Sequence, residues 1–251
     1  MNWLSRAMPP FLIPSLYLAV LMLSSLAVVK VVFPRALPSG RSIALASAVL
    51  IVECTALALG TLVDRHFDNQ SKPWMGKVFS LLGLATFGSL VLRRNELRSA
   101  GFCIPIRRSA IKSVSVSVSL LAITLGAAIL SPTHLDFSLG PLLLMALVSG
   151  VDEELVFRGL MPFFLTNPDA TGGSRQANTF LLLAVPTIAF ALMHAWRYIN
   201  GSLSFSAGTF AFTAIGSCGF MYIRRQSASL VHGVVAHNLI NTVTFVVLCV
   251  K

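Results

Sequence analysis

The residues most able to carry out chemistry are acidic, histidine and amide side chains gathered in the last 100 residues of a 251-residue chain. They are Asp152, Glu153, Glu154 and Arg158, then His194, and then His232, His237 and Asn241. Each group falls in a long apolar segment, where lipid makes an unpaired charge costly. Such residues therefore indicate a functional site or a specific structural partner.

The acidic cluster can place two carboxylates in different surroundings. On a helix, Glu154 and Arg158 are four residues apart and can pair on one face. Glu153 points about 100° away from Glu154, so it stays free for another partner. A carboxylate in apolar surroundings can act as a general base. The alternative is an interfacial charge cluster at the end of a helix.

The histidines and the amide can supply the other parts of a hydrolytic site. His237 and Asn241 project from one face of the last apolar segment and can both donate to a developing oxyanion. The alternatives are an interhelical polar clamp for this pair and a packing role for His194. His232 lies about 140° around the helix from His237, and we expect it at the membrane interface. Because amide hydrolysis needs a base, histidines and an oxyanion donor, we expect three helices to bring these groups to one water-filled cavity.

The composition predicts that a membrane-embedded helical bundle positions these residues. Apolar residues make up 55% of the chain and charged residues 11%, whereas soluble domains carry about 25% charged residues. A disordered chain is excluded, and an ordinary soluble enzyme is disfavoured. The predicted fold class is all-α, a polytopic transmembrane helix bundle forming one compact membrane domain.

Eight apolar segments are long enough to span a bilayer. They are 10–33, 42–63, 75–92, 113–131, 140–164, 178–199, 204–223 and 229–250. We interpret the first as a retained span and not as a cleaved signal peptide. Residues 113–119 alternate serine and valine, which is typical of a strand. A lone strand in lipid would leave its backbone unpaired, so we predict a helix whose serines bond to the backbone or to a neighbouring helix.

The charges of the connections predict the orientation. The net charge of +10 comes from basic residues mostly at the ends of apolar segments, which favours lipid headgroups as partners. Nucleic acid is not expected, because no basic stripe or aromatic platform accompanies the charge. The basic connections 93–112 and 224–228 should be cytoplasmic, and 132–139 should lie outside. Alternation then places both termini outside, although the basic connection 64–74 goes against this pattern.

The four cysteines do not indicate a disulfide framework or a zinc site. They are Cys54, Cys103, Cys218 and Cys249. None forms a C-x-x-C pair, and three of them lie within apolar segments, so we interpret them as small buried residues.

Three short motifs occur in order along the chain. They are E-E-x-x-x-R at Glu153, Glu154 and Arg158, F-x-x-x-H at Phe190 and His194, and H-x-x-x-N at His237 and Asn241. Together they resemble the motifs of the CAAX-protease and bacteriocin-processing family of intramembrane endopeptidases, which includes the type II CAAX prenyl endopeptidases. The resemblance covers about residues 140–250. It implies scaffold helices over 1–132 and a catalytic core over 139–250.

The resemblance implies a role for each residue of the first two motifs. Glu153 would be the general base that activates water. Glu154 would be the second glutamate of its motif, with Arg158 as its structural partner. His194 would bind and orient the water, and Phe190 would line the pocket.

The third motif bears on whether a metal is needed. The resemblance implies that His237 and Asn241 form the oxyanion hole. If zinc were bound, Glu153, His194 and His237 would be its ligands. The H-E-x-x-H pattern is absent, and an oxyanion role for His237 needs no metal, so we expect no cofactor.

The predicted function is an intramembrane endopeptidase of the cell membrane that hydrolyses a peptide bond with glutamate-activated water. Its cavity would open to the cytoplasm, and its partners would be the lipid bilayer and a peptide or membrane-protein substrate. The alternative is a non-catalytic scaffold or bacteriocin-immunity protein on the same fold. A transporter would need broken helices and paired repeats, which the sequence does not show.

Two positions stand apart from the motifs. Glu53, in the second segment, matches no motif, and we expect at most an interhelical hydrogen bond from its protonated form. His194 would lie far toward the outer face if the sixth helix began at residue 178. Either that helix begins earlier or Pro186 kinks it.

Overall fold

The computed structural model describes residues 40–67, 74–105, 110–166, 175–199 and 202–251. The predicted segment 10–33 lies outside these residues. The longer helices are α3 (Gly40–Phe67), α4 (Trp74–Val91), α5 (Ala110–Leu130), α9 (Arg175–Ala195), α10 (Ala207–Ser227) and α11 (Val231–Val250). The shorter elements are α6 (Leu139–Leu147), α7 (Val151–Glu154), a π-helix (Leu155–Leu160), α8 (Met161–Leu165) and the strands β1 (Trp196–Ile199) and β2 (Ser202–Phe205).

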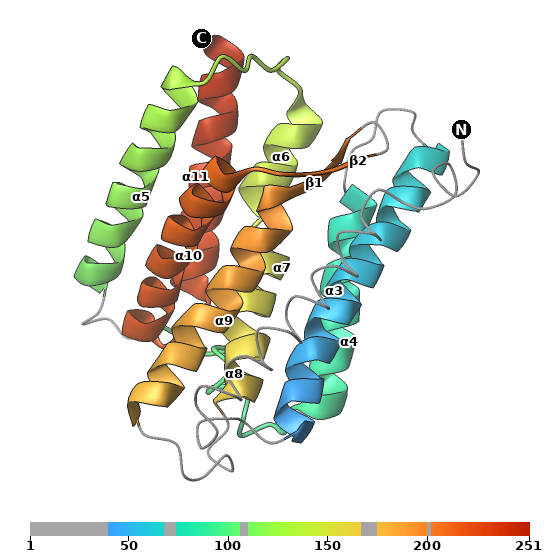
Figure 1. The fold of residues 1–251 in the computed structure, drawn as a ribbon, viewed down its shortest axis with the longest axis vertical. Coiled ribbons are helices and arrows are strands. Elements are labelled where there is room, and N and C mark those ends of the chain that lie inside the picture. The colour runs from blue at the N-terminus through green and yellow to red at the C-terminus, as the bar shows by residue number, and fades with distance from the viewer. Residues whose placement is uncertain (1–39, 68–73, 106–109, 167–174, 200–201) are drawn as a thin grey trace.

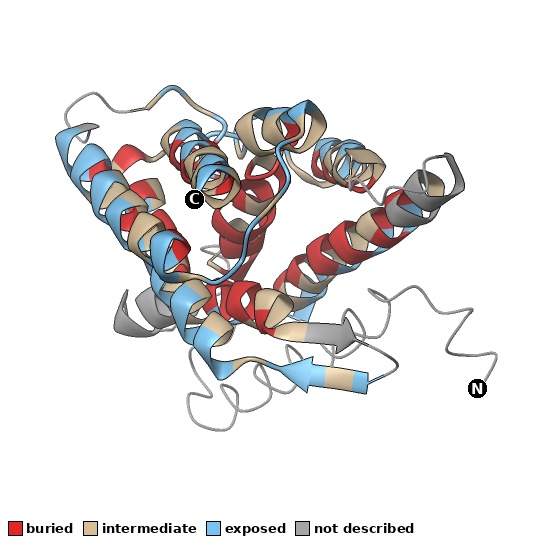
Figure 2. Cartoon of the chain, turned by 90° about the horizontal axis from the view of Figure 1, so that it is seen from above, coloured by how far each residue is buried: buried red, intermediate tan, exposed pale blue. Residues whose placement is uncertain are grey.

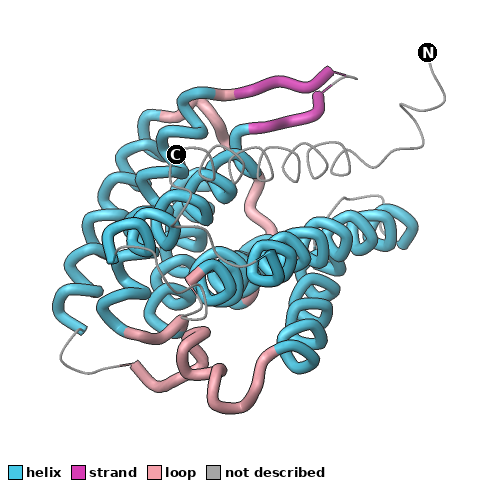
Figure 3. Tube along the Cα trace, turned by 60° about the horizontal axis from the view of Figure 1, so that its bottom comes forward, coloured by secondary structure: helices cyan, strands magenta, loops and turns pink. Residues whose placement is uncertain are grey.

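The helices form two groups with the short elements between them. α3 and α4 pack as one antiparallel pair, and α5, α9, α10 and α11 form the second group (Figure 1). The chain of short helices from α6 to α8 lies between the groups, because α8 contacts α3 while α7 contacts both α4 and α11. The same division is visible from a second direction in Figure 3. The residues that follow the break between α6 and α7 are therefore enclosed from several sides.

Two clusters of apolar side chains hold the helices together. The larger core cluster joins α3, the π-helix, α8 and α9 around residues such as Val49, Phe157 and Phe190. A smaller cluster joins α5, α10 and α11 through residues such as Leu120 and Ile240. Figure 2 shows the buried residues facing the centre of the molecule. The smaller cluster holds part of the second group together, and the larger one joins α3 to α9 through the short helices.

The outer faces of the long helices are apolar. Large exposed side chains include Leu82 and Leu90 on α4, Val114 on α5 and Leu239 on α11. Four stretches of the described chain are long and apolar enough to cross a bilayer: Gly40–Gly60, Trp74–Val91, Ile111–Leu130 and Val231–Val250. Continuous apolar surface of this kind belongs in lipid. The chain is a membrane protein, and the prediction of an all-α bundle is confirmed.

The serine-rich segment is helical, as predicted. Three serines of α5 donate their hydroxyls to carbonyls three or four residues earlier on the same helix. These bonds run from Ser115 to Lys112, from Ser117 to Ser113 and from Ser119 to Ser115, at 2.9, 2.8 and 3.0 Å. The hydroxyls are satisfied without any partner strand, so the alternation of serine and valine does not produce a sheet.

The prediction of one continuous helix over 140–164 is wrong. α6 stops at Leu147, and Val148, Ser149 and Gly150 form a turn before α7. A π-helix, which carries one more residue per turn than an α-helix, then separates α7 from α8. Serine and glycine are poorer helix formers than the leucines before them, so the helix ends at this point.

A β-hairpin corrects the predicted boundary between the sixth and seventh segments. The helix expected to reach residue 199 ends at Ala195, and β1 pairs with β2 in antiparallel register from Trp196 opposite Phe205. The next helix begins at Ala207 and not at residue 204. The aromatic rings of Trp196 and Phe205 lie 5.1 Å apart and join the two strands. Alternating side chains and the dipeptide Asn200-Gly201 in the sequence are signals of such a hairpin.

The two basic connections lie together at one end of the molecule. Arg224 Nη2 donates to the Ser99 carbonyl at 2.8 Å, and the Leu230 amide donates to the Gly101 carbonyl at 3.1 Å. At the opposite end, the Leu135 amide donates to the Leu248 carbonyl at 2.9 Å. The charge pattern and the helix order therefore agree on which connections share a side.

We predict that cysteines introduced at the two ends react from opposite sides of the membrane. The variants are Arg94→Cys and His134→Cys, both exposed, in a chain whose four native cysteines are replaced. In intact cells displaying the protein at their surface, an impermeant maleimide should label only the second, because we expect the basic connection to face the cytoplasm. After lysis both should react. Labelling of Arg94→Cys in intact cells would show that the orientation is the reverse of the one expected.

Candidate active site

The site is built around the turn that interrupts the fifth segment. Inside a membrane, backbone groups freed from a helix need other partners. The Ser149 carbonyl accepts a hydrogen bond from Lys77 Nζ of α4 at 3.1 Å. The Gly150 amide donates to Asn238 Oδ1 of α11 at 2.7 Å. The break is thus satisfied by polar side chains of two other helices, which fixes their positions relative to α7.

Helix α11 lies directly against this turn. Asn241 Nδ2 donates to Ser149 Oγ at 2.9 Å. A Cβ on Gly150 would lie 2.8 Å from both Cβ and Cγ of His237, so only glycine allows this approach. The close contact places the H-x-x-x-N motif of α11 beside the E-E-x-x-x-R motif.

Glu153 divides its two carboxylate oxygens between different partners. Oε1 accepts a hydrogen bond from Lys77 Nζ at 2.9 Å. Oε2 lies 3.5 Å from His237 Nε2 and 4.0 Å from His194 Nε2. Oε2 therefore faces the two imidazole nitrogens and not the lysine. The side chains of Glu153 and His194 are 12% and 33% exposed, so the group is only partly closed.

Glu154 is fully buried and holds two other members of the motifs. Its Oε1 lies 3.2 Å from Arg158 Nη1 and 3.0 Å from His237 Nδ1. An ionised carboxylate only accepts hydrogen bonds, so the Nδ1–H of His237 is the donor. The bond fixes the ring so that Nε2 faces Glu153. Glu154 therefore orients His237, while Arg158 balances its charge, as the pairing expected from the sequence requires.

Arg158 is enclosed by aromatic rings and one hydroxyl. Its Nη2 donates to Ser217 Oγ of α10 at 3.1 Å. Its guanidinium carbon lies 4.4 Å from the ring centre of Phe190 and 5.2 Å from that of Phe220. Ring faces stabilise a cation that water cannot reach. The Phe220 ring also stacks on His237 at 4.7 Å, so the same aromatic groups hold the arginine and the histidine.

Phe190 positions His194 as well as lining the site. The Phe190 carbonyl accepts the Nδ1–H of His194 at 2.9 Å, and the two ring centres are 4.3 Å apart. The Nε2 atom is thereby left facing Glu153. α9 begins at Arg175, before residue 178, so the sixth helix starts earlier than predicted and reaches the site at its far end.

A second layer of polar residues lies behind the site, and sequence reasoning singled out its carboxylates but not Lys77. Lys77 Nζ also binds Asp152 Oδ1 at 3.0 Å. Glu53 of α3 accepts a hydrogen bond from Ser80 of α4, so it does make an interhelical bond, and in this bond the serine is the donor. Glu53 also faces Asp152. A lysine within a predicted span was the available signal for Lys77.

His232 lies apart from this cluster. It is the second residue of α11 and is half-buried. Its place near the end of the helix agrees with the interfacial position expected from the sequence.

The residues named for a zinc ion do not form a ligand set. Within the described ranges, no group of three or more His, Cys, Asp or Glu side chains is arranged to hold a metal. Glu153 directs one oxygen to the Lys77 ammonium, a cation that would compete with a metal for this carboxylate. The Nδ1 of His237 is committed to Glu154. None of the steps proposed below uses a metal.

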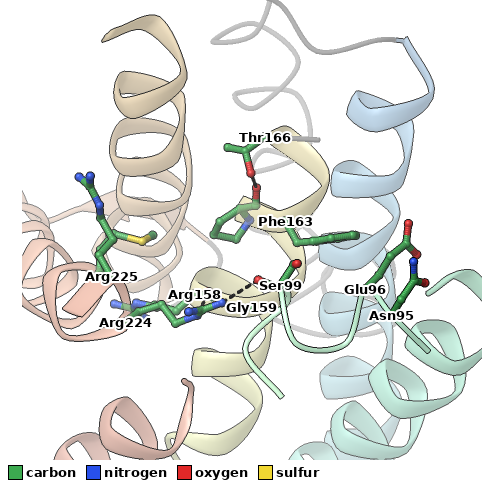
Figure 4. Close-up of a pocket in the computed structure, with 11 residues that line it drawn as sticks. Asn95, Glu96, Ser99, Arg158, Gly159, Phe163, Thr166, Arg224 and Arg225 are labelled. Atoms are coloured by element: carbon green, nitrogen blue, oxygen red, sulfur yellow. Dashed lines mark hydrogen bonds between the residues drawn. The ribbon is translucent and has the colours of Figure 1, made fainter. Parts of the chain in front are cut away.

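A cavity of about 410 Å³ lies beside Arg158, at the end that carries the basic connections. Its lining includes Ser99, Phe163, Arg224 and Arg225 (Figure 4). Arg224 closes one wall by donating to the carbonyls of Ser99 and Arg158. The cavity therefore borders the residue that pairs with Glu154.

We predict that a methyl group at Gly233 destabilises the site. A Cβ there would lie 2.5 Å from Glu154 Oε2. The Glu154 carboxylate cannot move away freely, because it is held in a buried ion pair with Arg158. Gly233→Ala should lower the free energy of unfolding by about 1 to 3 kcal/mol. The matched control is Gly126→Ala on α5, where a Cβ meets nothing within 4 Å. Thermal unfolding of the detergent-purified proteins measures both, and equal Tm values for the two variants would contradict this packing.

Comparison with known proteins points to one family. Residues 135–243 match the family model described as type II CAAX prenyl endopeptidase Rce1-like. No curated protein and no solved structure matched the chain. The match includes all three motifs and confirms the resemblance that they indicated. Over residues 135–243, the chain is similar to the Rce1-like type II CAAX prenyl endopeptidases.

Proposed function

We propose that the chain is an intramembrane endopeptidase in which Glu153 activates a water molecule to attack a peptide bond. The match of residues 135–243 to a protease family supports peptidase activity. The observation that carries the mechanism is the position of Glu153 Oε2, which faces His237 and His194 at 3.5 and 4.0 Å. A carboxylate, two imidazoles and a nearby amide are the groups that a metal-free hydrolysis needs.

The hydrogen bonds around the histidines define how a water would be held. The Nδ1–H of His194 is committed to the Phe190 carbonyl, so its Nε2 accepts a hydrogen from the water. The other hydrogen points to Glu153 Oε2. The water oxygen is then free to attack, and Glu153 takes its proton as the new C–O bond forms.

The oxyanion that develops on the substrate needs hydrogen-bond donors. Asn241 binds Ser149 through Nδ2, and its amide has a second N–H to offer. His237 can donate from Nε2 only when both ring nitrogens carry protons, because its Nδ1–H is used by Glu154. As the C–N bond breaks, protonated Glu153 returns its proton to the leaving nitrogen. The products are a carboxylic acid and an amine.

The substrate class follows from the surroundings of the site. The outer faces of the helices are apolar, so a substrate reaches the site from the lipid or from its boundary. We place entry at the cytoplasmic side of the cell membrane. The basic connections mark the cytoplasmic end, and the cavity at that end borders Arg158 but not Glu153 or the histidines. The substrate is a peptide or membrane protein, and prenylated CAAX peptides are the first to test.

We predict that Glu153→Gln abolishes hydrolysis. Glutamine keeps the size of the side chain and can still accept from Lys77, but it cannot take a proton from water. Turnover should fall by about 10² to 10⁴-fold. The full chain in proteoliposomes is assayed with a farnesylated CAAX peptide. Peptides released from total membrane proteins are followed in parallel by mass spectrometry.

The matched control for this experiment is Asp136→Asn, which removes an exposed carboxylate at the opposite end from the basic connections. It should behave like the unaltered protein. If the folded Glu153→Gln protein released the same peptides at the same rate, Glu153 would not be the base. If the unaltered chain released no more peptide than protein-free vesicles, it would be a non-catalytic scaffold or immunity protein on this fold.

A further inference from the structure

We propose that Lys77 of α4 is a positioning residue for Glu153, so that the helices before the family domain supply part of the catalytic machinery. This inference rests on the proposed function and names a residue that none of the three motifs contains. Lys77 lies outside residues 135–243, the part of the chain that matches the family.

Lys77 uses all of its hydrogen-bonding capacity on the residues around the helix break. An ammonium group has three N–H donors. They meet the Ser149 carbonyl at 3.1 Å, Asp152 Oδ1 at 3.0 Å and Glu153 Oε1 at 2.9 Å. The Lys77 side chain is only 12% exposed. Because every donor is directed at this one turn, the lysine serves the site and not the membrane surface.

The ammonium decides which oxygen of Glu153 is available. It binds Oε1, which leaves Oε2 toward the two imidazoles. Without it, Glu153 could rotate, and the adjacent carboxylates of Asp152 and Glu153 would repel each other in a site of low polarity. A catalytic group displaced by about 1 Å can lose about 10²-fold in rate. Lys77 therefore acts through Glu153 and has no direct part in the proton transfers.

The packing of α3 against α4 holds the backbone of Lys77 in place. Gly76, the preceding residue, lies so close to Gly60 of α3 that a Cβ on Gly60 would overlap its backbone. One turn further along α4, Ser80 donates to Glu53 of α3. Glu53 also interacts electrostatically with Lys77 and Asp152. The α3–α4 pair thus forms a support that aims the lysine at the break.

The test compares Lys77→Met, Lys77→Arg and the unaltered chain in proteoliposomes, with the farnesylated CAAX peptide as the probe. If that peptide is not cleaved, the probe is the peptide whose release from membrane proteins depends most strongly on Glu153. Lys77→Met should lower kcat by about 10- to 100-fold and change KM by less than about 3-fold. Lys77→Arg keeps the charge and should recover part of the loss. Lys112→Met, which removes an exposed lysine of α5, is the matched control and should leave kcat unchanged.

A further variant separates positioning from folding. Removing Lys77 alone leaves buried carboxylates without their partner, which can destabilise the protein. Lys77→Met combined with Asp152→Asn removes one charge of each sign. If this folded double variant has the low kcat of Lys77→Met, the positioning role stands. Wild-type kcat in a folded variant without Lys77, or a rise in KM at constant kcat, would overturn it.

The outcome is distinguishable from failure of the proposed function. If Glu153→Gln cleaves every probe as fast as the unaltered chain, the proposed function fails and the inference fails with it. If Glu153→Gln is inactive while Lys77→Met keeps full kcat, only the inference fails.

Discussion

The interruption of the fifth apolar segment is the constraint on which the rest of the site depends. A membrane offers no water to the carbonyl of Ser149 or the amide of Gly150, so protein groups must satisfy them. Lys77 and Asn238 do so from α4 and α11. These two contacts bind three separate parts of the fold at one point. The positions of the candidate catalytic residues and of the two helix groups both depend on that junction.

The balance of charge follows from the same junction. Glu153 and Glu154 are neighbours in sequence, yet one faces Lys77 and the histidines while the other faces Arg158. Each carboxylate has its own cation, and His237 lies between them with one ring nitrogen toward each. Two adjacent glutamates can therefore take different tasks, one held rigidly and one directed at a water.

Sequence reasoning predicted the helical membrane fold and named the residues that the structure gathers, because charges in apolar segments are few and costly. It missed the break at Ser149 and Gly150, since average hydrophobicity does not register a three-residue turn within an apolar run. It missed the hairpin after Ala195 because the spans were assigned by average hydrophobicity, which does not register the short alternating segments on either side of Asn200-Gly201. It missed Lys77 because a lysine near the end of a span normally extends to the interface. Only the tertiary contacts of α4 distinguish a lysine that extends to the interface from one that is buried.

The π-helix between α7 and α8 has a consequence for how this site tolerates changes in chain length. Its wider turn is equivalent to one residue inserted into an ordinary helix. The extra residue sets the angular phase between Glu154 before it and the anchored aromatic residues of α8 after it. Deletion of any one residue between Leu155 and Leu160 would restore regular winding and rotate everything on one side relative to the other. Length in this segment is therefore constrained as tightly as the identity of its side chains.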